Sequence, residues 1–233
     1  MFEKLEMGLE NLNNETVTTL QNAVTTSDQP KQPSPPPLKF GAIQIPLKAD
    51  PDPGSSEINI FEFQNSTNTH DYLMLIHGGI RGDCNYYAEA VTLLNTLTSQ
   101  SNVTVRIGSN GGSLYAGAII ANAVKTSKAK VTTIACGVVA SAAALIWSYG
   151  QTRLVEDGSV LLFHMSSHCD WGNSEGIRIT AENTVHYVKV VAVDPLVEQG
   201  ILTIDEAEAL IDKRQDVLID SNTMRERLEK QHA

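Results

Sequence analysis

Short apolar runs alternate with amphipathic segments along most of the chain after residue 56. The apolar runs are typical of buried strands and lie at 57–63, 72–76, 103–107, 131–136 and 159–163. Segments with apolar residues at helical spacing lie between or after them, at 85–97, 113–127, 141–150 and about 174–198. The capping box "TIDE" at 203–206 predicts one more helix start. This alternation with short turns predicts an α/β fold with a largely parallel sheet, flanking helices and burial on both sheet faces.

The first 55 residues differ from the rest of the chain in composition. Eight of the nine prolines precede residue 54, so 27–55 is expected to be an extended Pro-rich linker. Residues 1–26 carry a few leucines at helical spacing followed by polar residues, which predicts a weakly helical or disordered arm. A propeptide or a docking segment is the functional alternative for this arm. The folded domain is then expected to span 56–233, without internal repeats.

Charge and cysteine content narrow the function classes. The formal net charge of −10 argues against a nucleic-acid or anionic-membrane surface. Three cysteines without a CxxC pair indicate a reducing compartment, and the cytoplasm is expected; the acidic N-terminus does not resemble a secretory signal. Segment 131–148 is largely apolar but rich in β-branched and small residues. It therefore predicts a buried strand followed by a short helix rather than a membrane span.

Three predicted loops at the carboxyl ends of strands carry residues suited to acyl transfer. Ligands bind at this edge of a parallel α/β sheet. The loops hold the pair Gly111-Gly112, Ser141 at a helix start, and His164 at a strand end. Acyl transfer needs a serine, a base within reach, and N–H donors for the oxyanion, which glycines and helix starts supply. Each feature alone has an ordinary alternative, because a serine there is commonly a helix cap and such a histidine is commonly structural.

Together these blocks resemble the ClpP family of caseinolytic serine proteases. The stretch "NGGSLYAGAIIANAVKTSKAKVTTIACGVVASAAA" at 110–144 is similar to the central block of that family, with the family's spacing from Gly111 to Ser141. Arg153, Ser159 and His164 fall in register with the family's histidine block. The resemblance covers about residues 57–220 and implies the ClpP/crotonase-like fold.

The resemblance also implies roles for individual residues. The implied nucleophile is Ser141, the general base is His164, and the oxyanion donors are the N–H groups of Gly112 and Ala142. In "DKRQDVLID" (212–220), Asp216 matches the triad acid and Asp212 the carboxylate one turn earlier, with Asp220 as the alternative acid. Asp216 would hold His164 in the tautomer that accepts the serine proton.

The implied function is a serine endopeptidase that cleaves polypeptides within a homo-oligomeric ring, without cofactor or metal. Because the chain has no P-loop, an unfolding ATPase would be a separate partner. Ser-Ala-Ala at 141–143 and Met-Ser at 165–166 depart from the family pattern, as does the C-terminal segment. These departures bear on ATPase docking and the substrate groove, and suggest by analogy a viral capsid-maturation protease, with a capsid scaffold as partner and the host cytoplasm or virion as location.

Other interpretations stay open at this stage. A triad-bearing chain could be a catalytically silent ring subunit, and the related crotonases bind acyl-CoA thioesters without a serine nucleophile. A Ser–Lys enzyme similar to signal-peptide peptidase would have to use Lys128 or Lys130, at the wrong end of the strand before Ser141. The turn "IHGGI" at 76–80 is similar to a lipase oxyanion turn, but the chain has no G-x-S-x-G. A zinc cluster would use His164, His168, Cys169 and Asp170.

Overall fold

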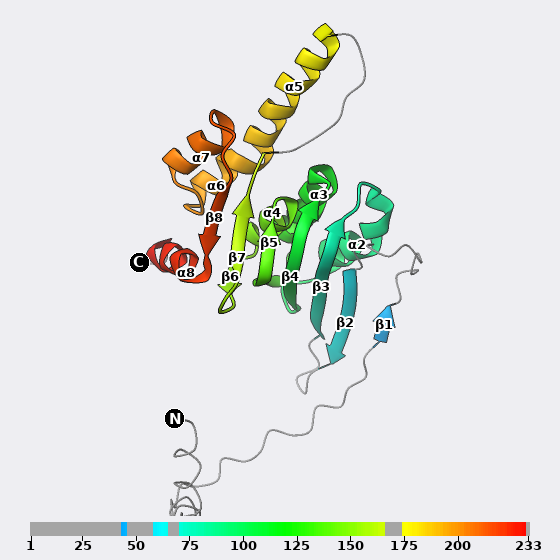
Figure 1. Ribbon diagram of the computed structural model, residues 1–233. Coiled ribbons are helices and arrows are strands. Elements are labelled where there is room, and N and C mark those ends of the chain that lie inside the picture. The colour runs from blue at the N-terminus through cyan, green and yellow to red at the C-terminus, as the bar shows by residue number, and fades with distance from the viewer. Residues whose placement is uncertain (1–42, 46–57, 65–69, 166–173, 232–233) are drawn as a thin grey trace, which may run out of the picture. The chain divides into compact units, whose positions relative to one another are not determined.

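A single sheet of eight strands organises the protein in the computed structural model, which describes residues 43–45, 58–64, 70–165 and 174–231 (Figure 1). The strands are β1 (Ile43–Ile45), β2 (Ile58–Gln64), β3 (His70–Ile80), β4 (Asn102–Gly112), β5 (Lys130–Ala140), β6 (Thr152–Val155), β7 (Val160–Phe163) and β8 (Val217–Asp220). Their order is β1-β2-β3-β4-β5-β7-β8, and β6 pairs with β5 beside β7.

The centre of the sheet is parallel and its edges are antiparallel. Strands β3, β4, β5, β6 and β7 pair in parallel, whereas β1–β2, β2–β3 and β7–β8 pair in antiparallel fashion. The predicted α/β fold with a largely parallel sheet is confirmed. Strand β1 falls within the segment predicted to be a linker. The predicted arm and the rest of that linker lie outside the described residues.

The predicted helices are present, with one irregularity. The helical elements are the 3₁₀ turn Cys84–Tyr87, α2 (Ala88–Thr96), α3 (Leu114–Thr126), α4 (Ala142–Ser148), α5 (Ser174–Val188), α6 (Asp194–Glu198), α7 (Ile204–Ile211) and α8 (Ser221–Gln231). A π-helical turn, Lys189–Val193, joins α5 to α6, so the long helix predicted over 174–198 changes its winding near its end. The capping box at 203–206 is formed by Thr203 and Glu206 as predicted.

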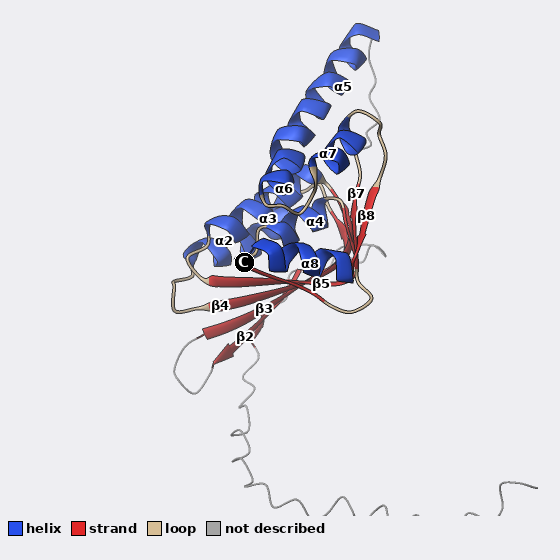
Figure 2. Cartoon of the chain, turned by 90° about the vertical axis from the view of Figure 1, so that its left-hand side faces the viewer, coloured by secondary structure: helices blue, strands red, loops and turns tan. Residues whose placement is uncertain are grey.

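Helices α2, α3, α4 and α8 lie on one face of the sheet, as Figure 2 shows, whereas α5 projects away from the sheet. On that face, strand residues such as Met74, Ile76 and Ile107 are buried. Their neighbours on the other face, such as Leu75 and Ile134, are only half-buried. The prediction of burial on both faces is therefore wrong for the described part of the chain.

Helix α4 is the centre of the core. All seven of its residues are buried, and its Trp147 ring nitrogen donates to the Leu154 carbonyl at 3.0 Å. A Cβ added to Gly117 would lie 2.7 Å from the Ala142 side chain, so only a glycine lets α3 pack this closely on α4. The apolar stretch at 131–148 is thus a buried strand and a short helix, as predicted. None of the described helices is both long and apolar enough to cross a bilayer.

Candidate active site

Ser141 stands between β5 and α4 in a strained backbone conformation. Its φ is 57° and its ψ is −126°, a region that residues with a side chain rarely occupy and that costs about 1–3 kcal/mol. Its backbone N–H donates to the Leu162 carbonyl of β7 at 2.8 Å. Its side chain makes no capping hydrogen bond to α4 and lines a pocket instead. Ser141 is therefore not an ordinary helix cap.

Two glycines bring the end of β4 against Ser141. Gly111 has φ of +84° and Gly112 has φ of +146°. A Cβ on Gly111 would lie 2.8 Å from the Ser141 Cβ and 3.1 Å from the Ala142 nitrogen. A Cβ on Gly112 would clash with the Ile80 carbonyl oxygen. The glycine turn and the start of α4 can approach each other this closely only because neither glycine has a side chain.

Two N–H groups around the glycine turn already have hydrogen-bond acceptors within the protein. The Gly111 N–H donates to the Ser109 hydroxyl at 3.0 Å, and the Ser113 N–H donates to the Ile80 carbonyl at 2.8 Å. Ala142 is the first residue of α4, so its N–H has no acceptor within the helix. Gly112 and Ala142 carry the N–H groups predicted for the oxyanion hole, and the two segments that hold them are in contact.

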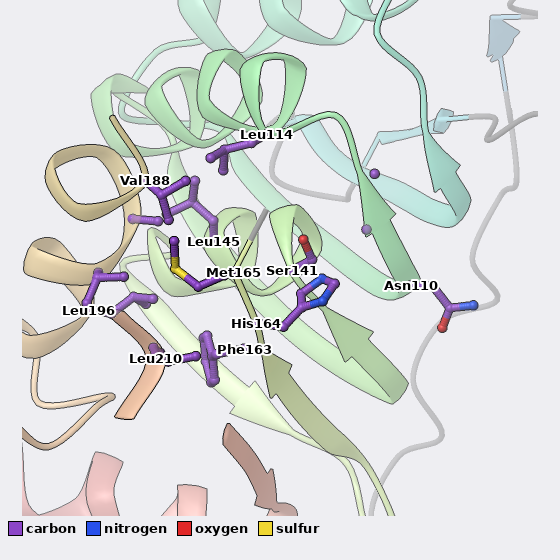
Figure 3. Close-up of a pocket in the computed structure, with 14 residues that line it drawn as sticks. Asn110, Leu114, Ser141, Leu145, Phe163, His164, Met165, Val188, Leu196 and Leu210 are labelled. Atoms are coloured by element: carbon purple, nitrogen blue, oxygen red, sulfur yellow. The ribbon is translucent and has the colours of Figure 1, made fainter. Parts of the chain in front are cut away.

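His164 follows β7 directly and lines the same pocket as Ser141. Figure 3 shows the imidazole ring and the serine hydroxyl at the same side of this pocket. The His164 side chain is exposed. Among the described residues, no hydrogen bond joins it to Ser141. The predicted nucleophile and base thus line the same pocket, but in the described chain they are not hydrogen-bonded to each other.

The strand pairing places Asp216 next to His164. In the antiparallel β7–β8 ladder, Phe163 pairs with Val217, so the next residues along are His164 and Asp216. Asp216 is exposed, and within the described chain no hydrogen bond or ion pair links it to His164. Asp212 lies further away in the chain, at the C-cap of α7. Asp216 is therefore the predicted carboxylate that the ladder brings to the histidine.

Asp220 sits at the other end of β8, where it pairs with Val160. His164 is four residues beyond Val160, which corresponds to about 13 Å along a strand, so Asp220 is far from His164. Its carboxylate accepts bonds from the Asn222 and Thr223 N–H groups at 2.9 and 3.0 Å and so caps α8. These backbone bonds and the Thr223 hydroxyl hold the pKa of Asp220 below its usual value.

An apolar pocket of about 250 Å³ extends from Ser141 toward the later helices (Figure 3). Its apolar wall comes from α3, α4, β7 and the helical segments between residues 188 and 210, through Leu114, Leu145, Phe163, Met165, Val188, Ala192, Val193, Leu196 and Leu210. Residues 188–210 were not predicted to contribute to a site. Their apolar spacing looks like that of any buried helix face, so nothing in the sequence marked them as part of a site.

The rest of the histidine block has a structural role. The Arg153 guanidinium donates to the Ser148 carbonyl and to the Gln199 and Gln231 side chains. Ser159 donates to the Ala135 carbonyl at 3.1 Å and accepts the Gly137 N–H at 3.0 Å. Ser159 thus ties β5 to the residue before β7, whereas Arg153 joins the end of α4 to Gln199 and to the end of α8.

The geometry excludes one of the two alternative sites, and the other lies largely outside the described residues. Lys130 begins β5 and Ser141 follows its last residue, and eleven strand residues span about 35 Å, too far for a Ser–Lys pair. The described residues contain no group of three His, Cys, Asp or Glu side chains that could hold a metal ion. Of the proposed zinc ligands, His168, Cys169 and Asp170 lie outside the described residues.

The parallel core, the antiparallel edges and a strained serine over an apolar pocket define an α/β protein with a pocket centred on one serine. A sequence profile of the Clp protease family matches residues 71–217. The chain belongs to this family, which confirms the resemblance seen in the sequence.

Individual relatives agree with this assignment. The ATP-dependent Clp protease proteolytic subunit 2 of Borreliella burgdorferi is 40% identical over 75 residues, which make up 32% of this chain and 38% of that protein. The match therefore spans well under half of the relative's length. The solved structure of a ClpP1 mutant from Listeria monocytogenes has a TM-score of 0.56 at 20% identity, covering 66% of this chain and 86% of that one. This likeness shows that the fold is that of ClpP.

Proposed function

We propose that the protein is a serine endopeptidase that uses Ser141, His164 and Asp216. The observation that carries the proposal is the strained backbone of Ser141, whose hydroxyl lines a pocket instead of capping a helix. Such strain persists only where the surrounding structure imposes it, and it is concentrated at functional sites. A base and a glycine turn line the same pocket, which gives the hydroxyl the groups that acyl transfer requires.

The proposed reaction follows from these positions. The Ser141 oxygen attacks the carbonyl carbon of the scissile peptide bond, and His164 takes the hydroxyl proton. The N–H groups of Gly112 and Ala142 stabilise the negative charge that develops on the carbonyl oxygen. The C–N bond then breaks, and His164 returns the proton to the leaving amine. A water molecule, deprotonated by His164, hydrolyses the acyl-enzyme, while Asp216 holds the imidazole in the required tautomer.

The apolar pocket supports a preference for peptides with an apolar side chain beside the scissile bond. Nine of its lining side chains are apolar, and its volume of about 250 Å³ suits one large apolar side chain. No lysine or arginine is among the residues that line the pocket. The proposed substrate is an unfolded polypeptide, and the proposed partner is a separate ATPase unfoldase that supplies it. If the chain is of the viral maturation type, the substrate is a capsid scaffold.

A homo-oligomeric ring is the proposed active assembly. Helix α5 exposes the apolar side chains of Ile177, Ile179 and Tyr187, and Val190 in the π-helical turn is exposed as well. Of the fifteen α5 residues, Val188 is the one that is buried. A helix with this surface needs a partner in water, and a second copy of the chain would supply one.

A catalytically silent subunit is the second candidate. It is favoured by the missing hydrogen bond between Ser141 and His164 in the described chain, and by the exposure of His164 and Asp216. Catalytic hydrogen bonds are often long before substrate binds or subunits assemble, so both candidates fit this geometry. Reactivity of the serine separates them.

The test is the intact mass of the protein after incubation with a fluorophosphonate probe, with size-exclusion fractions kept apart. We expect one adduct on the wild type, in the oligomeric fraction, and none on Ser141→Ala. Ser148→Ala is the control, because Ser148 is buried in α4 and its hydroxyl donates to the Leu145 carbonyl. An absence of adduct in every wild-type fraction would identify a silent subunit instead.

A further inference from the structure

Ser109 lies where two irregularities of the sheet meet. Between β3 and β4, the pairing jumps from His77 opposite Gly108 to Gly79 opposite Gly111. Between β4 and β5, the register shifts between Ile107 and Ser109. Backbone groups at such bulges lose their ladder partners and must be satisfied in another way.

The Ser109 hydroxyl satisfies two of these groups at once. It donates a short hydrogen bond to the Gly78 carbonyl and accepts the Gly111 N–H at 3.0 Å. The Ser109 residue is 3% exposed, so water does not replace these bonds easily. One buried hydroxyl therefore ties the bulge of β3 to the first glycine of the turn that faces Ser141.

From this bridge we infer that Ser109 is a positioning residue for the oxyanion hole. The inference rests on the proposed function, because the Gly112 N–H matters only if an oxyanion forms. With the Gly111 N–H bound to Ser109, the peptide between Asn110 and Gly111 is held in one orientation. This fixes where the following peptide begins, and that peptide carries the Gly112 N–H proposed to bind the oxyanion. Ser109 itself does not touch the substrate, since it is absent from the lining of the Ser141 pocket.

The chain contains a matched control in Ser127. Its hydroxyl donates to the Leu94 carbonyl at 2.7 Å and accepts the Ala129 N–H at 3.3 Å. It is 6% exposed, and it also bridges a carbonyl of another element to an N–H two residues ahead. Ser127 follows α3, before the start of β5, at the opposite end of that strand from Ser141. A general loss of stability should therefore affect Ser109→Ala and Ser127→Ala alike.

The experiment compares the two alanine variants and Ser109→Thr, which keeps the hydroxyl, on a fluorogenic peptide and on the fluorophosphonate probe. We expect Ser109→Ala to lower kcat about 10–100-fold with KM nearly unchanged, because misplacing one oxyanion donor weakens only the transition state. Ser127→Ala should keep kcat within about threefold at a similar Tm, and Ser109→Thr should recover most of the labelling rate. Equal kcat in Ser109→Ala and Ser127→Ala would overturn the inference.

A second readout does not depend on catalysis. Hydrogen exchange of fragments containing 109–113 and 127–131 reports each bridge separately. We expect Ser109→Ala to raise exchange at Gly111 by about tenfold or more, since the bond that protects its N–H is lost. Unchanged exchange there would contradict the positioning role even if the wild type proves unreactive. An unlabelled wild type with raised exchange would instead refute the proposed protease and leave the bridge established.

Discussion

At the scale of single residues, the site depends on positions where a side chain is impossible or strained. Gly111 has a positive φ and no room for a Cβ beside Ser141. Ser141 itself has a positive φ although it carries a side chain. The strained backbone of Ser141 is thus accommodated because Gly111, which lies against it, has no side chain. The two residues must be considered as a pair.

The first prediction concerns Gly111→Ala. The new methyl group would meet the Ala140 carbonyl and Ser141 in a backbone conformation that alanine avoids. We expect the free energy of unfolding to fall by about 2–4 kcal/mol and fluorophosphonate labelling to be lost. Urea unfolding and labelling measure the two effects. Gly82→Ala is the control, because a Cβ at Gly82 meets nothing within 4 Å; a similar loss in that variant would show that the effect is not local.

The second prediction separates the acidic residues that follow α7. Asp216→Asn should lower kcat/KM by about 10²–10⁴-fold, because an amide favours the wrong tautomer of His164. Its Tm should hardly change, since the side chain is exposed. Asp220→Ala should lower Tm by removing the cap of α8, with activity nearly retained. Steady-state kinetics and thermal melts of both variants decide this, and full activity in Asp216→Asn would move the role of the acid elsewhere.

At the scale of secondary-structure elements, one ion pair connects the two C-terminal helices. The Arg227 guanidinium of α8 binds both carboxylate oxygens of Glu206 in α7, each at 2.8 Å. Glu206 also closes the capping box at the start of α7. Partial burial raises the pKa of Glu206, but its bonds to Arg227 and Thr203 outweigh that effect and leave the pKa below its usual value. This carboxylate therefore favours the folded state when it is charged.

The third prediction is a pH-dependent loss of stability in Glu206→Gln. The folded pKa of Glu206 lies below the unfolded value of about 4.3. The stabilisation is then fully present above that unfolded value and disappears as pH falls through the lower, folded pKa. We expect Glu206→Gln to cost about 1 kcal/mol at pH 7 and less as pH falls below about 4.

Chemical denaturation at several pH values tests this. Glu182→Gln is the matched control, because Glu182 pairs with Arg178 on the exposed surface of α5. An exposed pair of this kind contributes little, so the control should leave stability within about 0.5 kcal/mol of wild type. A constant difference between Glu206→Gln and wild type from pH 7 to pH 3 would contradict the assigned pKa direction.

At the scale of the whole molecule, the sequence predicts the architecture better than the site. Most strands and helices follow from local periodicity, although β1, β6, β8 and α8 were not predicted, and the glycine and serine blocks follow from family spacing. The antiparallel position of β8, which pairs Val217 with Phe163 and so brings Asp216 beside His164, depends on long-range pairing that no local pattern encodes. The Ser109 bridge and the apolar wall at 188–210 also depend on tertiary packing. The one-sided covering of the sheet was missed because continuous apolar runs look the same whether a helix or another copy covers them.

The last prediction links assembly to reactivity. The α5 side chains of Ile177 and Ile179 are 40% and 45% exposed. If a second copy covers them, replacing both with glutamate places two charges in an apolar contact and should dissociate the assembly. We expect the double variant to elute as a smaller species with a normal circular dichroism spectrum.

His164 and Asp216 are exposed in the single chain. If assembly fixes their geometry, as proposed, labelling of this variant by fluorophosphonate should fall at least about tenfold. Asn222→Glu adds one charge to an exposed polar position of α8, away from the proposed contact, and should change neither elution nor labelling. Full labelling of a dissociated Ile177→Glu, Ile179→Glu variant would show that one chain aligns its own triad. The exposed apolar surface of α5 would then need a partner for a reason other than catalysis.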